Sequence, residues 1–289
     1  MHGSQEDTGW RKTISRERDR VQSQVLAGVV ACLLVAGAVA GPLRMSAAGM
    51  SLRPLLLPWL FSLGFAGLVW GLRSATLPAA GVGMLVCVVL AQAPAVARYG
   101  DRGAGFGGSA IPALIVLFVL TFAATRFGRK SKEKRGLAEA RTGRRASQIV
   151  ANLGVAALCG VVGWYAGCIA ALAEAVADTV SSEVGQAIGG QAWLITTLRR
   201  VAPGRDGGVS VAGTAAGMVA AGLVVAAGSL HGALWPHALP VFGAACAGLL
   251  FDSVLGATVE ERGWLGNDLV NFASTLFAAA ITLLWMGRS

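Results

Sequence analysis

Three carboxylates interrupt an apolar segment in the middle of the chain. Glu174, Asp178 and Glu183 lie within ten residues that are otherwise small or apolar, and they follow the apolar run 168–173. An acidic side chain at the centre of a bilayer costs about 2.5–3.5 kcal/mol. A helix that carries three acids must therefore lie near the membrane interface or gain compensation from a cation, a proton or water.

Helical geometry sorts these acids into two groups. A helix turns by about 100° per residue, so Glu174 and Asp178 share one oxygen-bearing face with Ser181 and Ser182. Glu183 lies about half a turn away from Glu174. Two interpretations follow: the helix breaks near the two serines, or Glu183 serves a different neighbour.

Two further acids belong to later apolar segments. Asp252 lies between Gly248 and Gly256 in segment 238–258, and glycines at this spacing let a second helix approach closely. An aspartate in a membrane helix is by default a functional hypothesis. Asp268 opens the last apolar segment, where it is either a helix cap that suits the dipole or a contact to a metal or nucleotide.

Loop 186–208 and the two residues after it combine glycines, arginines and a hydroxyl directly ahead of an apolar segment. Anions bind well at helix N-termini, because unpaired N–H groups point outward there. The spacing matches neither a Walker A loop nor a dinucleotide fingerprint. The loop is therefore either an ordinary turn or a phosphate site, and the candidate residues are Arg199, Arg200, Gly204, Arg205, Gly207, Gly208 and Ser210.

A second polar loop, residues 127–148, carries eight basic residues, among them Arg144 and Arg145. One interpretation is a loop that sets membrane topology and touches anionic lipid. The other is an electrostatic funnel for an anionic substrate.

The composition indicates a polytopic membrane protein. Of the 289 residues, 55% are hydrophobic and 13% charged, whereas a soluble domain carries about 25% charge. The five cysteines form no Cys-x-x-Cys pair and the three histidines are dispersed, which argues against a zinc site or a His-based triad. Membrane topology is the first explanation of the net charge of +9, so we expect no nucleic-acid partner.

Nine apolar segments predict an all-α membrane bundle of about seven to nine transmembrane helices. The pair 149–166 and 168–185 is either two crossings or one crossing plus a re-entrant piece. The segments are 25–41, 54–72, 76–97, 110–126, 149–166, 168–185, 209–230, 238–258 and 268–286.

The basic residues orient this bundle. If the N-terminus lies in the cytoplasm and the segments alternate, 19 of the 24 Lys and Arg residues fall on the cytoplasmic side. Loops 127–148 and 186–208 and the end of the acidic segment then share that side. We expect an integral protein of a bacterial-type inner membrane with its active site facing the cytoplasm.

Five carboxylates near one cytoplasmic level would face two basic loops. They are Glu174, Asp178, Glu183, Asp252 and Asp268. Acids for Mg²⁺ beside Arg, Lys and Gly-rich backbone for phosphates form the combination that phosphoryl transfer needs. No motif here resembles a nucleophile elbow or an activated Ser or Cys.

The combined motifs resemble a family of integral membrane proteins that includes the plant phytyl-phosphate kinase of tocopherol synthesis. The resemblance covers about residues 75–286, which leaves 1–24 as a basic cytoplasmic segment and 25–74 as an accessory transmembrane pair. This chain departs from the family at Glu260, where Gln is frequent, and at Leu153, which interrupts an Asn-Gly pair. The motifs are residues 148–154, 174–185, 197–210, 252–258 and 267–271.

This resemblance implies a membrane-embedded kinase-like domain over 75–286. Such an enzyme transfers the γ-phosphate of a nucleotide, with CTP the expected donor, to an isoprenyl monophosphate such as phytyl or geranylgeranyl phosphate. The cofactor is Mg²⁺. Asp178, Glu174 and Asp252 are the expected catalytic residues, and these three with Glu183 and Asp268 are the expected metal ligands. Further nucleotide contacts are expected from Asn152, Arg144, Arg145, Asn267 and Asn271.

Other functions fit parts of the same pattern. A CTP-dependent cytidylyltransferase differs only in which phosphorus is attacked, and a polyprenol kinase differs in its acceptor. An ion-coupled transporter also places acids near glycine-broken helices, although the two halves of this chain show no convincing inverted repeat. Prenyl chain length, nucleotide base and oligomeric state are not fixed by these residues.

Overall fold

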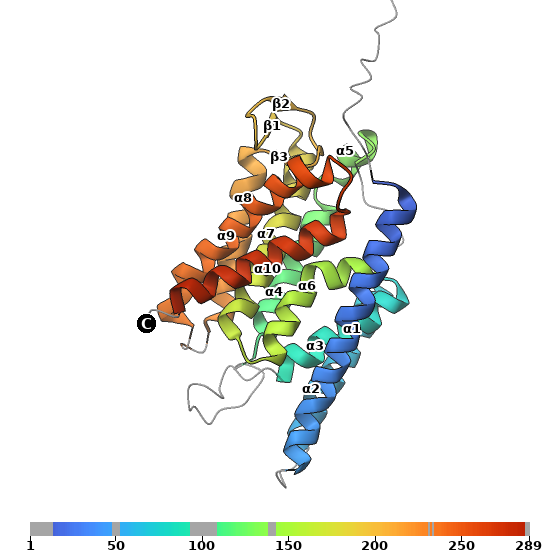
Figure 1. The fold of residues 1–289 in the computed structure, drawn as a ribbon, viewed down its shortest axis with the longest axis vertical. Coiled ribbons are helices and arrows are strands. Elements are labelled where there is room, and N and C mark those ends of the chain that lie inside the picture. Colours follow the sequence, from blue (N-terminus) through green and yellow to red (C-terminus); the bar gives the residue numbers. More distant parts are fainter. Residues whose placement is uncertain are drawn as a thin grey trace, which may run out of the picture.

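A computed structural model describes residues 14–47, 53–92, 109–137, 143–230, 232 and 234–286. The described chain is a bundle of α-helices with one small sheet (Figure 1). The first part of the predicted segment 1–24 and residues 138–142 of the basic loop lie outside the described residues. The helices are α1 (Arg16–Ala47), α2 (Arg53–Gly71), α3 (Leu77–Gln92), α4 (Ile111–Arg126), α5 (Arg129–Lys134), α6 (Ala146–Val161), α7 (Tyr165–Ile188), α8 (Val211–Gly228), α9 (Ala238–Leu255) and α10 (Asn267–Met286).

The predicted fold class is confirmed. Each of the nine apolar segments forms a helix, and among the α-helices of the described residues only the short α5 was not predicted. Four helices are long and apolar enough to cross a membrane by length and composition, and four shorter apolar helices accompany them. Segment 149–185 forms two helices, α6 and α7, joined by a tight turn in which Gly163 has a φ of 72°.

Helix α7 is the centre of the bundle (Figure 1). It packs against α4, α6, α8, α9 and α10, and most of its residues are buried. Its many alanines keep the helix thin, so neighbouring backbones come close. The helix is unbroken through Ser181 and Ser182, which decides between the two interpretations of Glu183: it serves a different neighbour.

Glycines bring α8 onto α7. A side chain at Gly217 would meet the backbone carbonyl of Ala177, and Gly213 faces the backbone near Ser181 in the same way. Small residues four apart on a helix allow this close approach. The contact fixes the start of α8 beside the acidic part of α7.

Helix α1 begins earlier than the apolar pattern predicts, at Arg16 rather than near residue 25. Its residues Val30, Leu34 and Ala38 are buried in the same core as α3 and α7. At its polar end, the Gln22 side chain donates to the carbonyl of Trp264 at 3.0 Å and accepts from the N–H of Gly266 at 3.0 Å. Helix α1 is therefore packed into the bundle, while α2 packs on α3 through a smaller apolar cluster.

One end of the bundle carries the polar elements (Figure 1). Loop 186–208 folds into an antiparallel sheet with strand order β2-β1-β3, formed by β1 (Ala192–Leu194), β2 (Arg200–Val201) and β3 (Gly208–Val209). Helix α5 lies at the same end. Beyond α9, the π-helical turn Gly256–Glu260 leads toward α10.

Candidate active site

A polar cleft of about 250 Å³ lies between the ends of the helices and the glycine-rich turn that precedes α8. Helices α6, α7, α9 and α10 each contribute side chains, and the turn 203–210 closes one side. The predicted site residues that line it are Arg144, Asn152, Asp178, Glu183, Gly204, Arg205, Gly207, Gly208, Ser210, Asp252, Asn267 and Asn271.

Two carboxyl groups meet in this cleft. Asp178 on α7 and Asp252 on α9 lie within hydrogen-bonding reach of each other. Two bare carboxylates this close repel, so they either share a proton or hold a cation between them. The hydroxyl of Ser274 on α10 also lies within reach of Asp252.

Glu174 stands one turn deeper than Asp178 on α7. It is 1% exposed, does not line the cleft, and lies near Asp252 and Ser274. The glycine predicted to allow close packing does so, because Gly248 on α9 lies directly against the Glu174 side chain and the α10 backbone. Glu174 is therefore a third carboxyl group behind the two aspartates, outside the cleft.

The glycine-rich turn is held by close backbone contact. Gly207 has a φ of 68°, and a side chain there would collide with Ala257 of the π-helical turn. Ser210 caps α8, since its hydroxyl accepts from the N–H of Gly213 at 3.1 Å. Ser210 also lines the cleft, so the start of α8 borders it, an arrangement that favours anions at a helix N-terminus.

The predicted arginines divide into two groups. Arg144 and Arg205 line the cleft, and Arg205 is ion-paired with Glu261 at 2.6 Å. Arg145, Arg199 and Arg200 are exposed and do not line it. Arg200 belongs to strand β2, so strand pairing sets the direction of its side chain.

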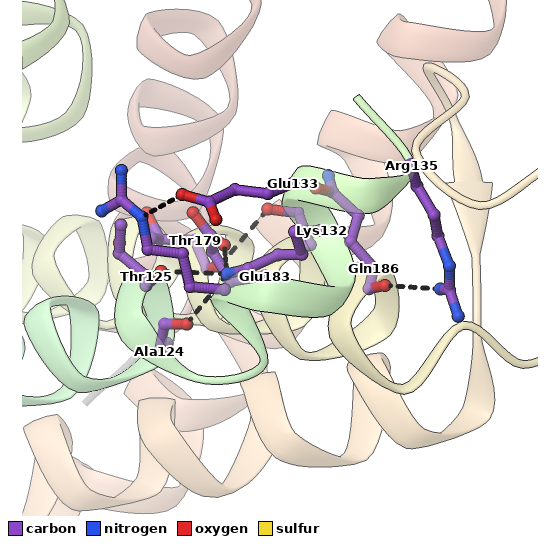
Figure 2. A network of polar contacts seen from close by, with 10 residues as sticks. Ala124, Thr125, Lys132, Glu133, Arg135, Thr179, Glu183 and Gln186 are labelled. Atoms are coloured by element: carbon purple, nitrogen blue, oxygen red, sulfur yellow. Dashed lines mark hydrogen bonds and ion pairs between the residues drawn. The ribbon is translucent and has the colours of Figure 1, made fainter. Parts of the chain in front are cut away.

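Glu183 has a cationic partner outside the aspartate pair. Lys132 on α5 is 1% exposed, and its ammonium is ion-paired with the Glu183 carboxylate (Figure 2). The same ammonium donates to the carbonyls of Ala124 and Thr125 at 3.3 and 3.0 Å, which caps the end of α4. This pairing gives Glu183 a cationic partner of its own on α5, apart from the aspartate pair.

Asparagines join α6 to α10 at the rim. The Asn271 amide donates to the Asn152 side-chain oxygen at 3.4 Å, and Asn152 donates to the carbonyl of Gln148 at 2.8 Å. Asp268 is 5% exposed in the first turn of α10 and does not line the cleft.

Several cleft residues were not predicted from the sequence. Asp206 and Glu260 add two carboxylates, and Glu260 lies close enough to Asp178 and Asp206 to be repelled by them. The sequence marked Glu260 only as a position where this chain has Glu and the family often has Gln. No periodicity marks Asp206, because it lies in a turn.

The charge balance of the cleft favours a cation. Within the described residues, four carboxylates besides the Lys132-paired Glu183 line it, against Arg144 and the Glu261-paired Arg205. One oxygen of Asp252 is buried without a hydrogen-bond partner. No group of three or more His, Cys, Asp or Glu in the described part of the chain forms a complete metal site. The five predicted ligands are therefore not gathered around one point. Mg²⁺ fits this donor set, because it uses one or two carboxylates together with substrate phosphates and water.

Comparison with known proteins shows the family. The profile of the family described as "Integral membrane protein DUF92" matches residues 60–279, from within α2 to within α10. The chain belongs to this family. The resemblance drawn from the motifs is thereby confirmed, and the chain is an integral membrane protein.

Relatives come from three kinds of organism. An uncharacterised membrane protein of Synechocystis is 38% identical over 59% of this chain and 72% of its own length. Protein VTE6, chloroplastic, of Arabidopsis thaliana is 29% identical over 62% of this chain and 59% of its own length. An uncharacterised membrane protein of Methanocaldococcus jannaschii is 32% identical over 59% of this chain and 74% of its own. No solved structure matches.

Proposed function

We propose that this protein is a membrane kinase that transfers the γ-phosphate of a nucleotide, CTP by the family resemblance, to an isoprenyl monophosphate. Support comes from the resemblance of the motifs to the family of the phytyl-phosphate kinase and from the similarity to protein VTE6, of which the match spans about three fifths. The observation that carries the proposal is the pairing of Asp178 with Asp252 beside Arg144 and a glycine-rich turn.

The chemistry requires no general base. A phosphate monoester has a second pKa of about 6 and is already an anionic nucleophile at neutral pH. One of its oxygens forms a bond to the γ-phosphorus while the bond to the β–γ bridging oxygen breaks. That oxygen leaves with the electron pair on the nucleoside diphosphate. Catalysis then depends on holding two anions together in line.

The chain supplies groups for both anions. Arg144 reaches the cleft just ahead of α6, and Arg205 lies in the turn before α8. The first two N–H groups of α8 have no acceptor within their own helix, while that of Gly213 donates to Ser210, so the first two suit phosphate oxygens. The amides of Asn152 and Asn271 line the opposite rim and are suited to orient the nucleotide.

Asp178 and Asp252 are the residues that would hold Mg²⁺. When bound, this ion would offset the charge of the β- and γ-phosphates and of the leaving diphosphate. Ser274 lies within reach of Asp252 and would help to keep it in position. The cleft residues fit a site that shares the metal with its substrate rather than enclosing it.

Product analysis tests the proposal. Purified protein is incubated with Mg²⁺, each nucleoside triphosphate and a series of prenyl monophosphates, and the products are identified by mass spectrometry. Nucleotide labelled at the γ-phosphorus should give a labelled prenyl diphosphate, and α-labelled nucleotide should not label the lipid. Transfer of the α label would establish a cytidylyltransferase, and ion-driven uptake without any product would establish a transporter.

A further inference from the structure

A second cavity lies beside the cleft, between α2, α3, α4 and α6. Its volume is about 510 Å³, within the range of about 300–1,000 Å³ that is usual for ligand sites. The inner walls are apolar. They include Phe65, Val69, Val86, Leu117, Phe118 and Leu153.

One end of this cavity is cationic. Arg73, Arg126, Arg129 and Arg144 line it together with Ser74. Arg126 stacks on the ring of Phe122, with 3.4 Å between its guanidinium carbon and the ring centroid, and Arg129 pairs with Glu133 at 3.0 Å. An apolar chamber with a guanidinium rim matches an amphiphile that has an anionic head group.

Backbone hydrogen bonds hold the rim together. The N–H of Arg144 donates to the carbonyl of Ser74 at 2.9 Å, and the N–H of Thr76 donates to the carbonyl of Arg144 at 3.0 Å. Gly143 makes this contact possible, because its φ is 77° and a side chain there would strike the backbone of Arg73 and Ala75. The turn between α2 and α3 is thereby fixed to the segment that enters α6.

Ser74 supplies an independent indication of a ligand. Its hydroxyl oxygen is buried and has no hydrogen-bond partner among the described residues. A buried hydroxyl without a partner is costly, and a bound oxygen acceptor would satisfy it. Ser74 belongs to the cavity lining, next to Arg73.

We propose that this cavity binds the lipid acceptor, with a single hydrocarbon chain between α2, α3, α4 and α6 and a phosphate monoester at Arg73, Ser74 and Arg144. The identity of the acceptor rests on the proposed function, whereas the amphiphile site rests on the cavity. Arg144 lines both the cavity and the cleft, so a phosphate held there borders the nucleotide site. Residues 53–92 are then part of the substrate site rather than accessory.

Two glycines on α3 provide a matched test. Gly83 lines the cavity and Gly81 is exposed outside it, and neither position has an atom within 4 Å of an added Cβ. Gly83→Phe should fill the cavity without displacing the backbone, and Gly81→Phe should place the same side chain outside it. Each buried methylene group contributes about fourfold in affinity. If the Gly83→Phe side chain excludes several methylene groups from the cavity, binding of a twenty-carbon monophosphate should weaken at least about tenfold.

Direct binding keeps this test separate from the kinase proposal. The probe is geranylgeranyl monophosphate with a diazirine on the chain, photo-crosslinked to full-length protein in detergent and mapped by peptide mass spectrometry. Wild type and Gly81→Phe should crosslink within 53–92 and 109–126, and Gly83→Phe should not. Equal labelling of all three proteins, or labelling confined to other helices, would overturn the cavity assignment. Crosslinking within these helices without any phosphoryl transfer would support the lipid site and contradict the proposed kinase function.

The head group is tested at Arg73. Its φ is 54°, a conformation that Asn tolerates better than most residues, so Arg73→Asn removes the charge with little strain. The variant should lose the preference of the wild type for the monophosphate over the corresponding alcohol, while nucleotide binding is unchanged. An unchanged preference would contradict the proposed phosphate position. Displacement of the probe by phosphatidic acid as readily as by unlabelled prenyl monophosphate would show a general lipid site instead.

Discussion

Asp178 on α7 and Asp252 on α9 present their carboxyl groups to each other at hydrogen-bonding distance. The two residues are more than seventy positions apart in the sequence, and both line the same cleft. Glycine at 248 lets α9 approach α7 and α10 closely enough for this meeting. A membrane protein that places two acids together here must neutralise them, and the proposed metal ion would do so.

Two arginines that are adjacent in the sequence differ in their position relative to the cleft. Arg144 lines it and Arg145 is exposed outside it. Arg144→Gln should raise KM for both the nucleotide and the prenyl phosphate by on the order of tenfold or more, because a charge-assisted contact to phosphate is worth about 1.5–3 kcal/mol. Arg145→Gln should leave both values near wild type. Equal effects of the two substitutions in steady-state kinetics would indicate a general electrostatic role of the loop.

The buried Lys132–Glu183 pair should govern stability rather than binding. Lys132→Met leaves a buried carboxylate without its cation and should destabilise the protein by about 3–5 kcal/mol. The double variant with Glu183→Gln should recover much of this loss, since the remaining charge is removed. Lys134→Met, at an exposed position of the same short helix, serves as the control. Thermal unfolding in detergent gives the comparison, and a Lys132→Met protein as stable as the control would disprove the role of the pair.

The sequence predicted the helices because each is a long apolar run, and it predicted Asp178 and Asp252 because acids in such runs are costly. It did not predict the burial of Lys132, because a basic loop with eight cations resembles a solvated segment. The strands of two or three residues carry no periodic signal, so the outward direction of Arg199 and Arg200 could not be foreseen. The start of α1 at Arg16 was missed because its first turns are polar.

Membrane topology remains a prediction, based on the positions of the basic residues. In a background without reactive cysteines, Lys130→Cys and Thr196→Cys should be protected from an impermeant thiol reagent in intact cells and become labelled after permeabilisation. Both are exposed positions at the polar end. Val162→Cys, exposed in the turn between α6 and α7, should be labelled without permeabilisation. The reverse pattern would place the cleft on the outside.

The central claim is that the two facing aspartates bind a metal–nucleotide complex, and Asp178→Asn tests it most directly. The amide keeps the shape and polarity of the side chain but removes the charge that would hold Mg²⁺. Asp268→Asn is the matched control, a buried acid at the same end of the bundle that does not line the cleft. Both proteins should fold and insert with the thermal stability of the wild type.

The measurement is Mg²⁺-dependent formation of prenyl diphosphate by these two variants at saturating substrate. Asp178→Asn should lose turnover by a factor on the order of 10² or more, because a group that supplies several kcal/mol of transition-state stabilisation is removed. Asp268→Asn should retain most of its activity. Near-normal turnover by a stable Asp178→Asn protein would contradict the account, because the carboxylate would then be structural.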